Sequence, residues 1–242
     1  MGERHITFAP DEWFHCFTRG VDKRTVFMDE VDGLRFQMLL YACNSAKPIH
    51  VSDFSGRKRL PDPIHVFAQE RSAPLVDVAA YCLMPNHPHL LLREVDYGGI
   101  SAFMQKVGTA YTMYFNKKYE RSGALFSGPF KAVHVEHDSH FRRAVNYIHA
   151  NPAELFEPRW KEGVVRSEVR LKKQLGQYPF SSLVDYQGIE RPQNAIVSIA
   201  AAMQILDIAP SFETLMKDAR DFYRRNKEFA DEPEGPNVKA RP

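Results

Sequence analysis

The sequence has few cysteines, almost no net charge and no long apolar run. Its three cysteines, Cys16, Cys43 and Cys82, are widely spaced and odd in number, which argues against a disulfide framework or a cysteine zinc site. The formal charge of +2 means that any nucleic-acid surface has to come from local clusters. The N-terminus, MGERHITFAP, carries charges where a signal peptide needs an apolar stretch. We therefore expect a cytoplasmic protein without a membrane span.

The composition predicts one main domain. With 242 residues, of which 44% are hydrophobic, the chain can bury one substantial core. Aromatic-rich or apolar runs predict strands, and apolar residues at helical spacing after a capping residue predict helices. These patterns predict strands at 13–17 and 130–135, extended segments within 75–92, and helices at 29–45, 101–119 (capped by Ser101), 138–151 (capped by Asp138 or Ser139), 195–206 and 212–223.

The segment 47–74 differs from its surroundings because it holds glycine, prolines and three consecutive basic residues, Arg57, Lys58 and Arg59. We expect a flexible loop with a short strand possible at 64–67. The basic residues fit either a solvated surface or an arm that contacts phosphates.

The stretch YCLMPNHPHLLL, residues 81–92, places His87 and His89 one residue apart in an apolar run. In a strand, residues i and i+2 point to the same face, so both imidazoles can reach one metal ion. The pair alone also fits chance or satisfied core histidines, because two ligands leave a divalent ion short of its full set. Pro85 and Asn86 place the pair just after a bend.

Basic and aromatic residues alternate between positions 114 and 131, with only Glu120 opposing them in the sequence. Positive charge for phosphates and planar side chains for stacking are what single-stranded nucleic acid needs. The alternative is that the lysines favour the helix end and the aromatic residues are core. The members are Tyr114, Lys117, Lys118, Tyr119, Arg121, Phe126, Phe130 and Lys131.

The helix that ends at YIHANP carries Tyr147 and Asn151, which are four residues apart and so lie on one face. Arg142 and Arg143 lie upstream on the same helix. Tyr111 and Tyr114 fit core or stacking positions better than a nucleophile, because their helix has to bury its apolar face.

Five segments follow one another along the chain: WFHCFTRG, YCLMPNHPHLLL, FMQKVGTAYTMYFNKKYERSGALFSGPFK, YIHANP and YPFSS. Their order resembles the single-tyrosine HUH transposases, in particular their REP-associated branch. The resemblance covers residues 13–186 and implies an α+β, ferredoxin-like (RRM-like) antiparallel sheet with helices on one face, plus a C-terminal helical extension. It suggests a catalytic domain at 1–155 with an insertion at about 46–74, followed by an extension at 156–225. The Pro-, Glu- and Lys-rich composition of the tail at 226–242 predicts disorder.

The resemblance also implies roles for single residues. His87 and His89 match the HUH histidines, and Asn151 matches the polar residue that completes a Mg²⁺ or Mn²⁺ site. Tyr147 matches the nucleophile, which would attack a phosphodiester of single-stranded DNA and form a 5′-phosphotyrosine. Because that bond keeps the reactivity of the broken phosphodiester, nicking and rejoining need no ATP.

The implied partner is single-stranded DNA that folds into palindromic hairpins with a short flanking guide sequence, bound by a monomer or homodimer in the cytoplasm or nucleoid. Thr18, Arg19 and Gly20 fall in the loop where relatives recognise DNA. The residues that we expect to contact DNA are Arg19, Tyr114, Lys117, Lys118, Arg121, Lys131, Arg142 and Arg143.

Three features depart from the family pattern. Pro88 stands between the two histidines and cannot donate a backbone hydrogen bond, which predicts an edge or bulge of the sheet there. Pro129 stands where relatives usually carry a basic residue, and the 47–74 insertion is longer than in most relatives.

Two other functions remain open from the sequence. One is a non-catalytic, domesticated nucleic-acid-binding protein of the same fold. The other is a metal-dependent hydrolase in which water attacks, which predicts no covalent adduct and tolerance of Tyr147→Phe. The intact set of His87, His89, Tyr147 and Asn151 favours the nicking and joining enzyme.

Overall fold

The computed structural model describes residues 7–47, 49–54, 61–206 and 210–225. Its centre is one antiparallel sheet with the strand order β2-β3-β1-β4. Together with α1 after β1 and α3 after β3, this order makes the βαββαβ topology of a ferredoxin-like fold. The strands are β1 (Trp13–Phe17), β2 (Val76–Met84), β3 (His87–Glu94) and β4 (Lys131–Val135).

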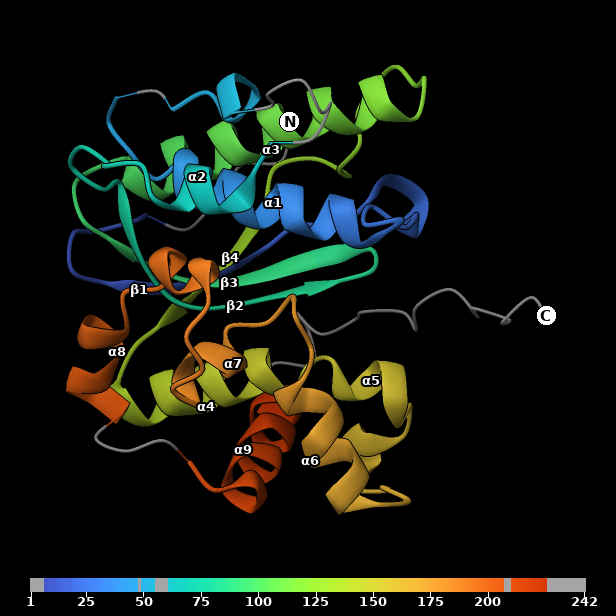
Figure 1. Cartoon of the computed structure of the whole chain (residues 1–242). Coiled ribbons are helices and arrows are strands. Elements are labelled where there is room, and N and C mark those ends of the chain that lie inside the picture. Colours follow the sequence, from blue (N-terminus) through green and yellow to red (C-terminus); the bar gives the residue numbers. More distant parts are fainter. Residues whose placement is uncertain (1–6, 48, 55–60, 207–209, 226–242) are drawn as a thin grey trace.

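Helices cover both faces of this sheet (Figure 1). The first face carries α1 (Glu30–Ala42), α2 (Pro63–Phe67) and α3 (Gly99–Lys118). The second face carries α4 together with the helices that follow it. These are α4 (Asp138–Ala150), α5 (Ala153–Phe156), α6 (Glu168–Gly176), α7 (Leu183–Tyr186), α8 (Ile199–Leu206) and α9 (Phe212–Arg225). Short 3₁₀ turns are η1 (Val21–Lys23), η2 (Val51–Phe54), η3 (Trp160–Glu162) and η4 (Pro192–Ile196).

The predicted α+β ferredoxin-like class with a C-terminal helical extension is confirmed. Helices α1 to α3 occupy one face as expected, and the second face is covered by α4 and the extension, which includes α8 against β2 and α9 along α4. The division of the chain at residues 155 and 225 stays a prediction. The predicted tail at 226–242 lies outside the described residues.

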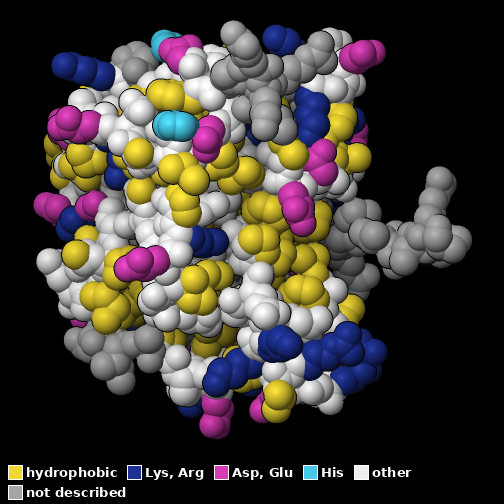
Figure 2. Space-filling model, in the orientation of Figure 1, with side chains coloured by type: hydrophobic (Ala, Val, Ile, Leu, Met, Phe, Trp, Pro, Cys, Tyr) yellow, Lys and Arg dark blue, Asp and Glu magenta, His cyan; other side chains and the backbone are white. Residues whose placement is uncertain are grey.

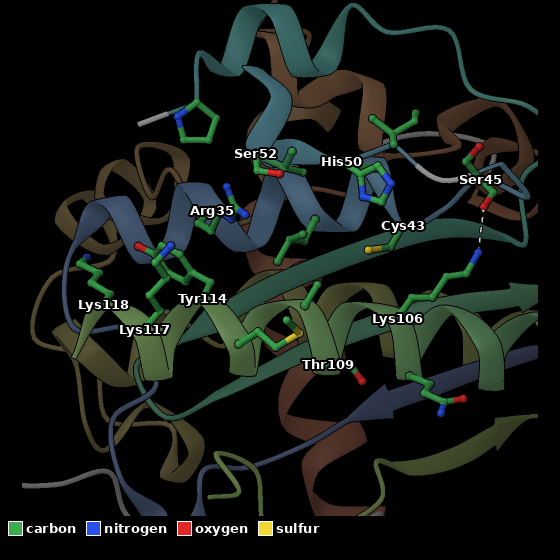
Figure 3. A pocket seen from close by; sticks show the side chains of 18 of the residues that line it. Arg35, Cys43, Ser45, His50, Ser52, Lys106, Thr109, Tyr114, Lys117 and Lys118 are labelled. Atoms are coloured by element: carbon green, nitrogen blue, oxygen red, sulfur yellow. Dashed lines mark hydrogen bonds between the residues drawn. The ribbon is translucent and has the colours of Figure 1, made fainter. Parts of the chain in front are cut away.

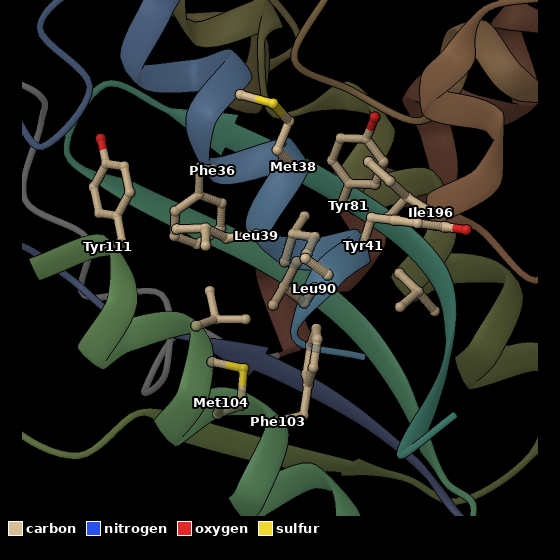
Figure 4. Packing of buried hydrophobic residues seen from close by; sticks show 14 of the residues in the cluster. Phe36, Met38, Leu39, Tyr41, Tyr81, Leu90, Phe103, Met104, Tyr111 and Ile196 are labelled. Carbon is tan, nitrogen blue, oxygen red and sulfur yellow. The ribbon is translucent and has the colours of Figure 1, made fainter. Parts of the chain in front are cut away.

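The first face of the sheet packs an apolar core against α1 and α3 (Figure 4). Leu90 of β3 meets Phe36 of α1 and Phe103 of α3 in this cluster, and all three are almost fully buried. Burying such side chains stabilises the fold by about 1.5–3 kcal/mol each. The opposite face packs Trp13, Leu91 and their neighbours against α4, α8 and α9.

Helix starts follow the physical rule of capping, although not always with the expected residue. Asp29 caps α1 as predicted, since its carboxylate accepts from the backbone N–H of Asp32. The predicted Ser101 cap is wrong: Glu94, at the end of β3, accepts from the N–H groups of Gly98 and Ile100 at the start of α3. A carboxylate placed by the sheet satisfies two amides that a hydroxyl inside the helix cannot reach.

The caps predicted for α4, Asp138 or Ser139, are also wrong. Its cap is His137, whose ring Nδ1 accepts from the N–H of His140. Helix α4 ends at Ala150, two residues before Pro152, as the proline predicts.

A two-residue turn, Pro85 and Asn86, joins β2 to β3. Pro88 pairs with Leu83 of β2, and the β1–β3 register ends at Phe17 opposite His89. No bulge lies at Pro88, because the register shift is at Val78/Ala80. Pro88 lies past the end of β1, so at this point β3 pairs with β2 alone, and the missing N–H falls on the unpaired side, as an edge position predicts.

The prediction of a strand at 64–67 is wrong. These residues lie in α2, which starts with Pro63 at its first position after the Asp62 cap. Arg57, Lys58 and Arg59 lie outside the described residues.

The segment PFSS runs along β2, where Leu83 N–H donates to Phe180 O and Ser182 N–H to Tyr81 O. It covers the outer edge of the sheet, where β2 would otherwise present unpaired backbone groups.

Among the described residues, no helix is both long and apolar enough to cross a membrane. Cys16, Cys43 and Cys82 are not joined to one another by disulfides.

Candidate active site

The two histidines of the HPH sequence lie on the second face of the sheet, under α4. The residues of β3 alternate, so His87, His89 and Leu91 share this face, while Pro88, Leu90 and Leu92 face the other way. The rings of His87 and His89 are 4.6 Å apart between centroids. The predicted shared face is therefore present in the structure.

A third histidine, His15 of β1, completes the cluster. Its Nε2 and the Nδ1 of His89 are 2.9 Å apart, in hydrogen-bond contact, and both side chains are buried. His87 makes the corresponding contact through its own Nδ1, with the side-chain oxygen of Asn86. A partner at Nδ1 fixes the orientation of an imidazole and leaves Nε2 as the atom for ligation, which is the usual arrangement of a metal-binding histidine.

Tyr147 reaches this cluster from α4. Its ring centroid is 5.7 Å from that of His89 and 5.9 Å from that of His15, with both pairs edge to face. These three side chains come from α4, β3 and β1, and Tyr147 is 58 positions further along the sequence than His89. Tertiary packing thus places a phenol beside the paired imidazoles.

Asn151 lies one turn after Tyr147, at the end of α4. Its side-chain Nδ2 donates to the carbonyl of Tyr147 at 3.0 Å, and the residue is fully buried. Its Oδ1 has no hydrogen-bond partner in the described part of the chain. A buried amide oxygen of this kind is an acceptor that an ion or a polar ligand can satisfy.

This donor set fits a hard divalent ion only in part. Across residues 7–47, 49–54, 61–206 and 210–225, no three or more His, Cys, Asp and Glu side chains form a metal-binding group. His15 contacts His89 through its Nε2 and so orients that ring. That His87, His89 and the Asn151 oxygen together hold Mg²⁺ or Mn²⁺, with water and phosphate oxygens as the remaining ligands, stays a prediction.

Helix α9 closes the site from outside. Phe222 stacks on Tyr147 with centroids 4.7 Å apart, and it also contacts His15 and His140. Asn146 Nδ2 donates to Asp218 Oδ2 at 2.9 Å, which fixes α9 along α4. Tyr147 is only 2% exposed as a result.

Some of the basic residues predicted to contact DNA surround this site. Lys131, Phe17 and His89 stand opposite one another in a row across β4, β1 and β3, and Lys131 is exposed at the end of this row. Arg19 follows two residues after Phe17 and is partly buried. Arg143 is one helical turn before Tyr147 on α4, with Arg142 beside it. Their contact with DNA stays a prediction.

The other predicted DNA residues lie elsewhere, at the end of α3 on the first face of the sheet. The hydroxyl of Tyr114 and the ammonium of Lys118 both contact the buried carboxylate of Asp32. Lys118 also pairs with Asp29, and Arg121 contacts the Asn116 side chain. The sequence suggested only Glu120 as an opposing charge because Asp29 and Asp32 are distant in the chain. DNA contact by Tyr114, Lys117, Lys118 and Arg121 stays a prediction.

Two features of the structure were missed by sequence reasoning. One is His15, which a polar residue in the middle of an aromatic strand could have indicated. The other is a basic surface in the region of α5 and α6, where Figure 2 shows Lys and Arg side chains gathered together. Its exposed members are Arg159, Arg166, Arg170, Lys172 and Lys173.

Comparison with known proteins supports the family predicted from the motifs. No curated protein matches the sequence. Among solved structures, the chain is similar to a REP-associated tyrosine transposase bound to a REP hairpin, at 14% identity and a TM-score of 0.48, covering 80% of this chain and 90% of that one. Residues 53–151, which contain His87, His89, Tyr147 and Asn151, match the family described as "Transposase IS200 like". Over this segment, the chain is therefore similar to the IS200-like transposases.

Proposed function

We propose that this chain nicks and rejoins single-stranded DNA through a covalent 5′-phosphotyrosine at Tyr147. The observation that carries the proposal is the edge-to-face contact of Tyr147 with His89. The Nδ1 of His89 is engaged by His15, and the Nδ1 of its neighbour His87 is engaged by Asn86. A phenol beside an imidazole held in this way suits a tyrosine nucleophile that works with a divalent ion.

Each residue has a distinct role in this reaction. The Tyr147 oxygen attacks phosphorus, the bond from phosphorus to the 3′ oxygen breaks, the phenol gives up its proton, and the 3′ oxygen gains one. His87, His89 and Asn151 would hold Mg²⁺ or Mn²⁺, which when bound stabilises charge on the scissile phosphate. In the reverse step, a strand 3′-hydroxyl attacks the phosphotyrosine and releases Tyr147.

The basic residues near the site supply the electrostatic part of binding. Arg143, one turn from Tyr147, and Lys131, in the row of His89, place positive charge on either side of the phenol. The resemblance to the REP-associated branch suggests a hairpin substrate, with Arg19 in the recognition loop, and a cytoplasmic or nucleoid location.

The test is detection of a covalent protein–DNA adduct on a denaturing gel, with labelled single-stranded hairpin oligonucleotides and Mn²⁺. We expect an adduct with the wild type that is lost with EDTA and in Tyr147→Phe. Tyr111→Phe is the matched control, because Tyr111 is also buried but donates to Val26 O in the core of the first face. Cleavage that persists in Tyr147→Phe would replace this mechanism by a hydrolase in which water attacks.

One observation favours a second function, a non-catalytic DNA-binding protein of the same fold. Tyr147 is almost fully covered, with Phe222 stacked on it, so DNA cannot reach the phenol while α9 stays in place. Tight hairpin binding without an adduct, both in the wild type and in a Phe222→Ala variant, would support this second function.

A further inference from the structure

A pocket of about 1410 Å³ lies on the side of the sheet away from Tyr147 (Figure 3). Helices α1 and α3 form two of its walls, and residues 49–52, which lead into η2, form a third. The proposed reaction at Tyr147 uses none of the residues that line it. The pocket therefore requires a separate explanation.

Its lining combines an apolar surface with positive charge. Leu39, Ala110 and Met113 are among the apolar residues, and Met113 is exposed. Four cationic side chains line the same space, whereas Glu120 is the one carboxylate among its described lining residues. Such a combination fits an anion that also has an apolar or planar part. The cations are Arg35, Lys106, Lys117 and Lys118.

Arg35 differs from its cationic neighbours in having no anionic or carbonyl partner among the described residues. Its guanidinium lies 5.2 Å from the centre of the Tyr114 ring, and its Nε is buried without a hydrogen bond. Lys118, by contrast, pairs with Asp29 and Asp32, and Lys106 donates to the carbonyl of Ser45.

This lack of a partner has a physical cost. Burial of the Arg35 side chain lowers the pKa of its guanidinium, which shows that the charged form is poorly solvated. A half-buried cation without an anion is less favourable than a solvated one, and a bound anion with two oxygens offsets that cost through paired hydrogen bonds.

We propose that this pocket binds a nucleotide unit, with its phosphate at Arg35 and Lys117 and its sugar and base over the apolar lining. The guanidinium fork matches phosphate oxygens, and a planar base matches the ring of Tyr114, which lies near Arg35 and Lys117 (Figure 3). The same chemistry is offered by a free mononucleotide and by one nucleotide of a single strand. The site needs neither Tyr147 nor a metal ion.

Cys43 lines the pocket and provides a reporter confined to it. Burial raises the pKa of the Cys43 thiol to about 11, so its alkylation is slow and sensitive to further covering. The other two thiols, Cys16 and Cys82, are fully buried. Alkylation of Cys43 by iodoacetamide, followed by mass spectrometry, therefore reports occupancy of the pocket and of no other site.

The experiment uses the full chain without divalent metal, so that no cleavage occurs. Thymidine 5′-monophosphate, oligothymidylate of about eight nucleotides and thymidine without phosphate are added separately. We expect a phosphate-bearing probe to slow alkylation and thymidine to have no effect. Protection by the monophosphate identifies a free-nucleotide site, and protection by the oligonucleotide alone identifies a strand site.

Two variants test the residues. Arg35→Gln should weaken protection about tenfold, since a charge-assisted contact to phosphate is lost. Arg71→Gln is the matched control, because Arg71 is also half-buried over a tyrosine ring, at 4.3 Å from Tyr41, but donates to Ala195 O outside the pocket. Lys117→Glu changes an exposed side chain and keeps the test valid should Arg35→Gln fail to fold.

The proposal is overturned if no phosphate-bearing probe protects Cys43, if thymidine protects equally, or if both pocket variants bind like the wild type. Protection of Cys43 in a protein that forms no DNA adduct would leave this site standing and refute only the proposed function.

Discussion

The two faces of the sheet are made from alternate residues of the same strands, but their cores differ. On the first face, Leu90 and Leu92 of β3 belong to an apolar and aromatic cluster that includes side chains of α1 and α3. On the second face, His87 and His89 of the same strand meet His15 and Tyr147 within an otherwise apolar cluster.

The difference shows how one strand serves stability and chemistry together. A polar cluster in the middle of a core costs free energy unless its groups are hydrogen-bonded, and His15 with His89 is one such bonded pair. The first face keeps its polar groups, such as Asp32 with Tyr114 and Lys118, on the helices, while the residues of β3 that face it are apolar and can supply the stability. We therefore expect mutations on the first face to affect folding most and mutations on the second face to affect activity most.

The largest expected effect compares neighbours on β3 that point to opposite faces. Leu90→Ala should lower the free energy of unfolding by about 3 kcal/mol, because it leaves a cavity in the first core. His89→Ala should cost roughly 1–2 kcal/mol and abolish metal-dependent adduct formation. Urea unfolding and the gel assay on the folded protein measure the two quantities. If Leu90→Ala and His89→Ala lost the same stability and the same activity, the two faces would not divide stability and catalysis between them.

His15→Phe sharpens the comparison within the second face. Without the contact at Nδ1, the His89 ring is no longer oriented, and the affinity for Mn²⁺ should fall about 10–100-fold. Nicking should recover as the Mn²⁺ concentration is raised, which a merely structural defect would not do. Cys16→Ala, the next residue on β1 but on the first face, is the control and should leave the Mn²⁺ dependence unchanged.

Acid should destabilise the second face through His149 of α4. Burial against Ser182 lowers the pKa of this imidazole to about 3, so the folded protein excludes a proton that the unfolded chain binds below pH 6.5. The free energy of unfolding is therefore highest well above pH 6.5. It decreases by about 2 kcal/mol as the pH is lowered from 7 to 5.

The measurement is urea unfolding across this pH range. His149→Gln should remove most of the slope, whereas His65→Gln, at an exposed histidine of α2, should leave it in place. An unchanged slope in His149→Gln would assign the acid sensitivity to other groups.

The smallest expected effect concerns the cover over Tyr147. Phe222→Leu keeps an apolar side chain on α9 but removes the stacked ring, so Tyr147 should be uncovered more often and adduct formation should accelerate by a few fold. Met216→Leu, also on the buried face of α9, is the control for general packing. A slower reaction in Phe222→Leu would mean that the ring positions Tyr147 productively.

Local sequence patterns predicted many of the strands and helices. The alternation of residues in WFHCF and HPHLLL, the capping Asp29 and the stop before Pro152 each act within a few residues, and the strands and helices form where they predict. The segment at 64–67 was misread, because its apolar residues suit either structure and Asp62 with Pro63 favours a helix start.

The sequence by itself determined the family resemblance and the residue types of the candidate site. His87 and His89 share a face because strands alternate, and Tyr147 and Asn151 share one because helices repeat every 3.6 residues. Only the tertiary structure decided what meets across those faces, because contacts between distant segments depend on how the elements pack. It brought His15 to His89, Phe222 to Tyr147, and Asp32 to Tyr114 and Lys118.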